Sequence, residues 1–321
     1  MKSNDDNGAF NPGQSIVNQM KSKYGNKQNS DQVKKISEES KDEYEDERYK
    51  NLDPRMVEQI EGEILEKSPG ITWNDIAGLE FAKKTIKELI ILPLMRPDIF
   101  RGIRSPSKGV LLFGPPGTGK TLIGKAIAHE SNSTFFSISS STLTSKWVGE
   151  SEKMVRTLFA LATIHQPSVV FIDEIDSILC ARNENEQEGS RKIKTEFMVQ
   201  FGGTRSEQED RILIIGATNR PEELDEAVRR RLEKRLYIPL PSKDGRKVFI
   251  RNMIDKEVQS GLKIDMVDED IDTIVEMTRG YSGADLKSLC TEASLVPLRS
   301  IIDISMIEID SIRPVNVTDF K

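Results

Sequence analysis

The eight residues GPPGTGKT at positions 114–121 constrain this chain more than any other segment. They fit G-x-x-x-x-G-K-[ST] without a mismatch, after an apolar run at 109–113 and before apolar residues at helical spacing. A glycine-rich turn from strand into helix points backbone N–H groups and the positive end of the helix dipole at one spot, which suits phosphates. Lys120 would reach the β- and γ-phosphates, and the Thr121 hydroxyl would bind Mg²⁺. The weaker alternative is a turn that binds nothing, so we expect a nucleoside triphosphate site. Its candidate residues are Gly114, Pro115, Pro116, Gly117, Thr118, Gly119, Lys120, Thr121 and Leu122.

Composition narrows the class of protein. The 321 residues allow roughly two folded units. No apolar run approaches the roughly 18 residues of a membrane span, and the N-terminus lacks the apolar segment of a secretory signal. Two cysteines favour a reducing compartment, so we expect the cytoplasm or the nucleus. Two histidines argue against histidine-based metal or triad chemistry, and a net charge of -6 disfavours a general nucleic-acid surface.

The polar and apolar pattern divides the chain into four parts. Residues 1–50 are polar and densely charged, which predicts disorder, and residues 51–70 predict a linker helix. Strands and helices alternate over 71–240, which is typical of a parallel sheet covered on both sides, and 241–321 predict a small helical domain. The expected strands are Val110–Phe113, Phe135–Ser139, Val169–Asp173, Ile212–Ala217 and Arg235–Ile238. The expected helices of the small domain are Lys243–Lys256, Asp268–Arg279 and Ser282–Arg299, the last opening on a Ser282-x-x-Asp285 capping box.

Two carboxylates, Asp173 and Glu174, directly follow one of these apolar runs. Mg²⁺ takes few protein ligands, so Asp173 facing Thr121 suits metal binding. Glu174 is placed to polarise a water for attack on the γ-phosphate. By itself a strand that ends in acids beside a turn is an equally good interpretation, but the phosphate loop favours ATP hydrolysis.

Two further polar features admit two interpretations each. Asn219 follows the run 212–217 and either positions the attacking water or the γ-phosphate, or is a simple turn residue before Pro221. The arginines at 229–231 either complement the dipole of a short helix, or supply a cation across a subunit boundary to the transferring phosphoryl group. The residues alone leave the two interpretations of the arginines equal.

Two basic stretches are candidates for contact with a polypeptide. In the loop 145–150, Trp147 either packs into the core or projects as an aromatic grip, with Lys146 attracting acidic segments. The second stretch, 190–194, begins a helix, and a solvated helix face is its default explanation.

Taken together, the segments 114–121, 173–174, 219, 230–231 and 281–285 resemble an AAA ATPase domain, over about residues 71–320. Residues 145–150 and 239–241 are similar to the clade that contains katanin, spastin, fidgetin and the endosomal-sorting ATPase. Residues 51–56, 121–125, 134–139 and 152–156 are most similar to its fidgetin-like members. The resemblance implies an α/β fold: a P-loop AAA+ module whose parallel sheet is flanked by helices, followed by a small helical-bundle lid.

The resemblance also implies a homo-hexamer with ATP and Mg²⁺ at the subunit boundaries. Arg230 and Arg231 would then act on the nucleotide of the neighbouring subunit. The implied pore residues are Lys146, Trp147, Val148, Arg191 and Lys192, with Lys194 adding positive charge. The implied contacts to adenine and to the nucleotide from the lid are Asp75, Ile76, Ala77, Gly78, Gly283 and Ala284.

Three departures from the resemblance bear on function. The chain ends at Lys321, where relatives continue into C-terminal helices that help ring assembly. Leu232 stands where several relatives carry Phe, and the loop 181–189 lacks a His that is common in relatives.

The leading hypothesis is a remodelling ATPase that pulls an acidic polypeptide tail through the pore, to sever microtubules or to disassemble recombinase filaments. The alternative is a nucleotide-bound regulatory subunit of a mixed ring. A nucleic-acid motor ranks lowest, because the chain has no basic surface or aromatic stacking platform.

Overall fold

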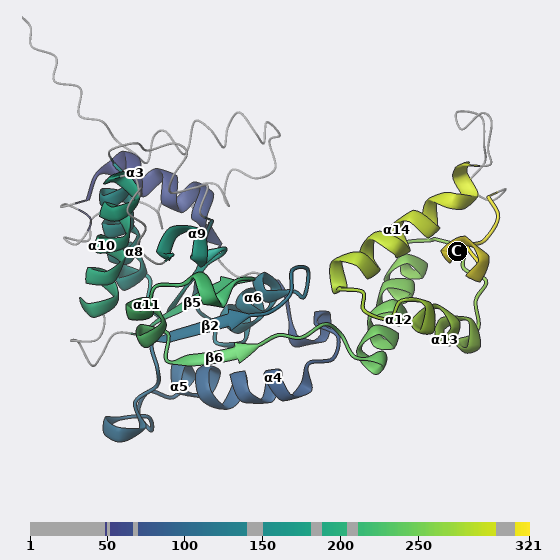
Figure 1. Cartoon of the computed structure of the whole chain (residues 1–321), viewed down its shortest axis with the longest axis horizontal. Helices are drawn as coiled ribbons and strands as arrows, with labels where there is room; N and C mark the ends of the chain where they lie inside the picture. The colour runs from purple at the N-terminus through teal and green to yellow at the C-terminus, as the bar shows by residue number, and fades with distance from the viewer. Residues whose placement is uncertain are drawn as a thin grey trace, which may run out of the picture.

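The computed structural model of the chain has two parts, a larger α/β base and a smaller helical lid (Figure 1). It describes residues 49, 52–66, 70–139, 150–180, 188–203, 211–299 and 312–321. The expected disorder of residues 1–50 therefore lies outside the described residues, with the exception of Tyr49. That residue is buried against the base, and its hydroxyl lies 2.9 Å from His165 Nε2.

Along the sequence, the elements of the base precede those of the lid. The base contains α3 (Pro54–Gln59), η1 (Ile60–Ile64), β1 (Leu65–Glu66), η2 (Trp73–Asp75), α4 (Glu80–Ile86), η3 (Lys87–Ile91), α5 (Leu92–Met95), η4 (Gly102–Arg104), β2 (Gly109–Phe113), α6 (Lys120–Glu130), β3 (Thr134–Ile138), α8 (Ser151–Ile164), β4 (Ser168–Ile172), α9 (Ile175–Leu179), α10 (Glu188–Gly203), β5 (Ile212–Thr218), η5 (Pro221–Glu223), α11 (Glu226–Arg231) and β6 (Lys234–Tyr237). The lid contains α12 (Lys243–Gln259), α13 (Asp268–Met277), α14 (Gly283–Arg299) and η8 (Val317–Phe320).

Within the described residues, six strands form one sheet in the order β1-β3-β4-β5-β2-β6. Strands β3, β4, β5, β2 and β6 are parallel, which confirms the predicted fold, and their bounds differ from the expected ones by at most one residue at each end. The edge strand β1 is antiparallel to β3, with Leu65 opposite Phe136. No pattern in the sequence predicted β1, because two residues are too short to show periodicity.

The strands are apolar along their whole length because helices cover both faces of the sheet. Alternate residues of β2 point to opposite sides: Val110 and Leu112 pack with α4, η3, α5 and α6, whereas Leu111 packs with α3, α8, α9 and α10. The chain leaves β2, β4 and β5 at the same edge of the sheet, and these three strands are neighbours in it. In such sheets ligands bind outside the carboxyl ends of the strands, and this is where the sequence places its polar residues.

The segment expected as a linker helix packs against the base. Its helix α3 begins at Pro54, where the Asp53 carboxylate accepts the N–H of Arg55 at 3.0 Å. Its residues Met56, Val57 and Ile60 are buried, the last two in the core layer that contains α8. Because β1 follows directly, the segment adds both a helix and an edge strand to the base.

The lid has a small core of its own, centred on Ile250, Ile274 and Leu286. Its helix α14 opens on the predicted capping box: Ser282 N donates to Asp285 Oδ2 at 2.8 Å, and Asp285 N donates to Ser282 Oγ at 3.2 Å. Among the described helices of both parts, none has the length and apolar character needed to cross a membrane.

Candidate nucleotide site

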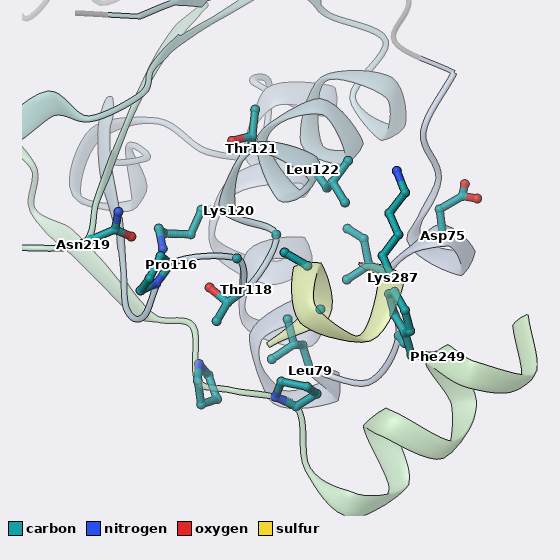
Figure 2. A pocket seen from close by; sticks show the side chains of 18 of the residues that line it. Asp75, Leu79, Pro116, Thr118, Lys120, Thr121, Leu122, Asn219, Phe249 and Lys287 are labelled. Atoms are coloured by element: carbon teal, nitrogen blue, oxygen red, sulfur yellow. The ribbon is translucent and has the colours of Figure 1, made fainter. Parts of the chain in front are cut away.

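A cavity of about 490 Å³ opens at the carboxyl edge of the sheet, between base and lid (Figure 2). Loops from the base form one wall, and helices α12 and α14 of the lid contribute to the other. The lining residues are Asp75, Ile76, Ala77, Leu79, Pro116, Gly117, Thr118, Gly119, Lys120, Thr121, Leu122, Asp173, Glu174, Asn219, Pro239, Pro241, Phe249, Gly283, Ala284 and Lys287. The structure therefore brings residues from seven separate stretches of sequence into one pocket.

The loop between β2 and α6 is tightly packed, and glycine is required at two points. At Gly114, with φ +151°, an added Cβ would lie 2.2 Å from the carbonyl oxygen of Ile238. At Gly117, with φ +72°, it would lie 2.6 Å from Ser282 Oγ in the lid. Helix α6 begins at Lys120, so its first N–H groups lack partners within the helix and lie beside the pocket. This end of the pocket is suited to bind anionic oxygens.

The Lys120 side chain is buried beneath this loop. Its ammonium donates to the carbonyl oxygens of Gly114 at 3.0 Å and Pro115 at 2.8 Å. Burial lowers the pKa of Lys120, and the nearby Asp173 carboxylate acts in the opposite direction. The two carbonyls hold the cation at the phosphate end of the pocket, where it can offset the charge of a polyphosphate.

Thr121 and Asp173 meet across two elements of the base. Thr121 Oγ1 donates to Asp173 Oδ2 at 2.8 Å, which joins the start of α6 to the end of β4. A hydroxyl and a carboxylate beside a phosphate site fit Mg²⁺, which binds to one or two protein oxygens and keeps several waters. When bound, the ion neutralises charge that develops on the transferring phosphoryl group. No cluster of three or more metal-ligating side chains occurs in the part of the chain that the structure describes.

Glu174 and Asn219 complete the phosphate end of the pocket. Glu174 has left-handed backbone angles, φ 48° and ψ 47°, which are uncommon for a residue with a side chain. Its N–H donates to Asp173 Oδ1 at 3.0 Å, and this bond holds the turn after β4. A carboxylate and an amide at this position can orient an attacking water and accept its proton.

One supporting pair in this region was not predicted from the sequence. Thr218 Oγ1 donates to Asp176 Oδ1 at 2.5 Å and accepts the N–H of Arg220 at 2.9 Å. These bonds hold the turn that carries Asn219 against the start of α9. A sequence signal existed, because Thr218 ends one buried strand and Asp176 lies shortly after another, but only the neighbouring position of β4 and β5 brings them together.

The far end of the pocket is more apolar. Ile76 and Ala77 line it as expected. Gly78 does not line this pocket; it packs against Gly245 and lines an adjoining hollow. Several residues at this end had no sequence signal beyond ordinary packing and were not predicted. They are Leu79, Pro239, Pro241, Phe249 and Lys287.

The lid contacts the phosphate loop directly. Ala284 N donates to Gly117 O at 3.1 Å, and an added Cβ at Gly283 would lie 3.3 Å from the same oxygen. The start of α14 therefore packs on the loop through small residues, and Gly283 and Ala284 also line the pocket.

Arg230 and Arg231 lie away from this pocket. They are on α11, which Figure 1 shows on the side of the base turned away from the lid. The Arg230 side chain is 76% exposed and pairs with Glu226 at 2.5 Å. Arg231 Nη1 lies 3.6 Å from Met198 Sδ. Neither side chain lines the nucleotide pocket of its own chain.

The structure places only part of the predicted pore. Lys146, Trp147 and Val148 lie outside the described residues. Arg191 and Lys192 are exposed on α10, beside a hollow that Glu152, Thr195 and Glu196 also line. Lys194, in contrast, is buried.

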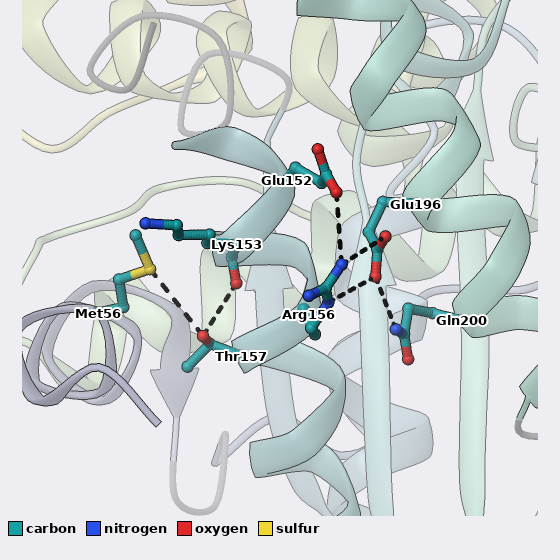
Figure 3. A network of polar contacts seen from close by, with 7 residues as sticks. All are labelled: Met56, Glu152, Lys153, Arg156, Thr157, Glu196 and Gln200. Carbon is teal, nitrogen blue, oxygen red and sulfur yellow. Dashed lines mark hydrogen bonds and ion pairs between the residues drawn. The ribbon is translucent and has the colours of Figure 1, made fainter. Parts of the chain in front are cut away.

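Helices α8 and α10 are joined beside this hollow by an ion-pair network (Figure 3). Arg156 donates to both carboxylate oxygens of Glu196, Nε to Oε1 and Nη2 to Oε2, each at 3.2 Å. Gln200 donates to the same carboxylate at 2.8 Å, and Arg156 also reaches Glu152 at 3.3 Å. Arg156 lowers the pKa of Glu196, whose side chain is only 9% exposed.

Comparison with known proteins supports the same interpretation. Residues 110–240 match the ATPase family associated with various cellular activities (AAA), and residues 268–313 match the AAA+ lid domain. The crystal structure of the FIGL-1 AAA domain in complex with ADP superposes with a TM-score of 0.77 at 52% identity, covering 84% of this chain and 89% of that one. The chain belongs to the AAA family of ATPases, and the pocket between base and lid is its candidate nucleotide site.

Two further comparisons place the chain within that family. Fidgetin-like protein 1 of Rattus norvegicus is 58% identical over 278 residues, which are 86% of this chain and 40% of that protein. A structure described as the structural basis for katanin self-assembly has a TM-score of 0.70 and 40% identity, and covers 84% of this chain and 89% of that one. The predicted resemblance to the katanin, spastin and fidgetin clade, and to its fidgetin-like members, is confirmed. This chain spans about 40% of the length of that curated relative.

Proposed function

We propose that this chain is the motor part of a homo-hexameric ring that uses ATP hydrolysis to pull polypeptide segments through a central pore. The observation that supports it best is the position of Arg230, highly exposed on α11 and outside the pocket of its own chain. An arginine in that position can act on nucleotide only if it belongs to another copy. Such a head-to-tail contact closes into a ring when the rotation between copies is suitable. The self-assembly described for the katanin relative supports the same arrangement.

The basic residues on α10 support the choice of an acidic polypeptide as substrate. Arg191 and Lys192 are exposed next to the network that joins α8 and α10. In a ring of identical copies each such face recurs in every subunit, so a modest local charge becomes a continuous basic surface. This surface would attract an acidic tail although the chain as a whole has a net charge of -6.

Ring formation is tested by measuring ATP turnover per subunit against protein concentration, with Glu174→Gln as the blank. We expect turnover to rise steeply with concentration, because each complete site needs two copies. Turnover that stays at the blank level would favour the alternative, a regulatory subunit that hydrolyses ATP only with a fuller partner.

Mixed rings test the role of Arg230 directly. Arg230→Ala and Glu174→Gln are each expected to lack turnover alone and to recover part of it when mixed. The nucleotide of an Arg230→Ala subunit then receives an intact arginine from its Glu174→Gln neighbour. Mixing Glu174→Gln with Lys120→Ala is the matched control, because both defects lie in the same pocket and no complete site can form. Recovery in the control, or none in the test, would contradict the proposal.

The choice of polymer needs substrate assays. Turnover should rise with tubulin that carries its acidic tails and not with tail-less tubulin if microtubules are severed. Stimulation by recombinase filaments alone would assign the other substrate.

A further inference from the structure

Lys287 lies in the nucleotide pocket, and neither the motifs nor the resemblance assigns it a role. It is on the lid helix α14, one helical turn after Gly283 and Ala284, which line the same cavity. Figure 2 shows its extended side chain rising along the lid side of the pocket, with Phe249 near its base and Asp75 and Leu122 in the region of its ammonium. The only cationic side chains that line the pocket are therefore Lys120 and Lys287, among the residues that the structure describes.

The two ammonium groups differ in their partners. Lys120 donates to two carbonyl oxygens of the loop, whereas the ammonium of Lys287 has no hydrogen bond or ion pair within the described part of the chain. The carboxylate of Asp75 is already engaged: Oδ1 accepts Lys256 at 2.9 Å, and Oδ2 accepts Thr72 N at 3.0 Å and Thr72 Oγ1 at 2.9 Å. The Lys287 side chain thus lines the cavity, and no acceptor among the described residues binds its ammonium.

The position of Lys287 along the pocket restricts what it can contact. Lys120, Thr121 and Asp173 form the phosphate end of the pocket, and Leu122 follows them on the pocket wall. Ile76, Ala77, Leu79 and Phe249 make the other half apolar, which suits the faces of a purine base. The ammonium of a long, exposed lysine on the pocket wall can donate to an oxygen acceptor of a ligand. In a nucleotide the ribose, with its two hydroxyls, joins the base to the phosphates, so it would lie between the apolar half and the phosphate end.

We propose that the Lys287 ammonium donates a hydrogen bond to the ribose hydroxyls of the bound nucleotide, and that this lid residue thereby favours ribonucleotides. The bond also links the lid to the nucleotide, in addition to the contact between Ala284 and Gly117. The proposal rests on nucleotide binding at this pocket and is independent of ring formation and of the polypeptide substrate.

The test is calorimetric titration of ADP and 2′,3′-dideoxy-ADP into the full chain and into Lys287→Met, because fluorescent groups attached to the ribose would disturb the contact. We expect Lys287→Met to weaken ADP binding by about three- to ten-fold, a range typical of an exposed charge-assisted hydrogen bond. Binding of the dideoxy nucleotide should change less than two-fold, since it has no hydroxyl to accept the bond. Lys287→Arg, which keeps a donor, should retain part of the preference for ADP.

Two controls make the result specific. Lys247→Met removes one positive charge from the lid outside the pocket, where Lys247 pairs with Asp272, and should leave both affinities unchanged. Thermal melting checks that each variant is folded. Equal weakening of ADP and dideoxy-ADP by Lys287→Met would show that Lys287 acts on the base or the phosphates and would overturn the proposal. An unchanged affinity for ADP would overturn it as well.

Discussion

The Lys256 ammonium of the lid lies 2.9 Å from Asp75 Oδ1 of the base, and this ion pair joins residues 181 positions apart in the chain. Asp75 ends the short helix η2, directly before Ile76 and Ala77 in the pocket. The ion pair therefore ties helix α12 to the segment that forms one wall of the nucleotide site. Lid position and pocket shape are linked through this contact.

We expect Lys256→Met to weaken the attachment of the lid to the base by about 0.2–1 kcal/mol, since both partners are partly exposed. The hydrogen bond from Lys256 is the main cause that lowers the pKa of Asp75 to about 2 from an ordinary value of 3.8. Because the pKa of Asp75 is lower in the folded state, its ionised carboxylate stabilises the fold at any pH above the ordinary pKa. This stabilisation is lost as the pH falls from about 4 towards 2. Urea unfolding of wild type, Lys256→Met, Asp75→Asn and the double variant should give a coupling at pH 7 that disappears near pH 2. A coupling that persists at pH 2 would contradict this account.

Lys120→Ala should abolish measurable nucleotide binding while the chain stays folded. The ammonium is the charge that the loop carbonyls hold at the phosphate end, and its removal leaves polyphosphate without a buried cation. Calorimetric titration with ADP measures the loss. Lys125→Ala is the matched control, because Lys125 lies on the same helix and pairs with Glu66 outside the pocket. Binding that survives in Lys120→Ala would overturn the assignment of the phosphate end.

Glu174→Gln should keep nucleotide affinity and lower ATP turnover by about 10²- to 10⁴-fold, the usual contribution of a general base. The amide fills the same space and keeps the backbone bond from Glu174 N to Asp173, but it cannot accept a proton. Phosphate release and ADP titration measure the two properties separately. Glu222→Gln, which changes an acid in the short helix η5 outside the pocket, is the control and should leave turnover unchanged.

Gly124→Ala should destabilise the base by about 1–3 kcal/mol through overpacking. Helix α6 crosses β4 so closely at this point that an added Cβ would lie 2.5 Å from the Phe171 ring. Gly62→Ala is the control, because its added Cβ would have no atom within 4 Å. Urea unfolding measures the stability of both variants. If Gly124→Ala were as stable as Gly62→Ala, the Phe171 side chain would have room to move away from the added methyl group.

Arg156→Met should cost about 1–3 kcal/mol, because it leaves the nearly buried Glu196 carboxylate without its cation. Arg156 is the main cause of the lowered pKa of Glu196, so its stabilising effect is present at neutral pH and is lost as the pH falls below the ordinary value of 4.5. Arg156→Lys should recover only part of the loss, since a lysine cannot make both parallel bonds to the carboxylate. The difference in unfolding free energy between Arg156→Met and wild type should therefore be largest at neutral pH and should shrink as the pH is lowered below 4.5.

The sequence by itself determined the fold class and the phosphate end of the site. The order of apolar runs predicted the parallel sheet, and GPPGTGKT together with Asp173 and Glu174 predicted which strand ends carry the chemistry. This was possible because helix starts, strand ends and glycine-rich turns depend on local backbone preferences, which short segments record directly.

The tertiary structure alone decided the rest. The pairing of Asp75 with Lys256, of Asp176 with Thr218, and the entry of Lys287 into the pocket depend on elements distant in the chain being packed side by side. Such contacts leave no periodic pattern in the sequence. From sequence alone, a lysine on a helix is expected to face solvent, and only the tertiary structure shows which surface lies next to it. The position of Arg230 outside its own pocket likewise follows from the packing of α11, and that position supports the proposed action between copies.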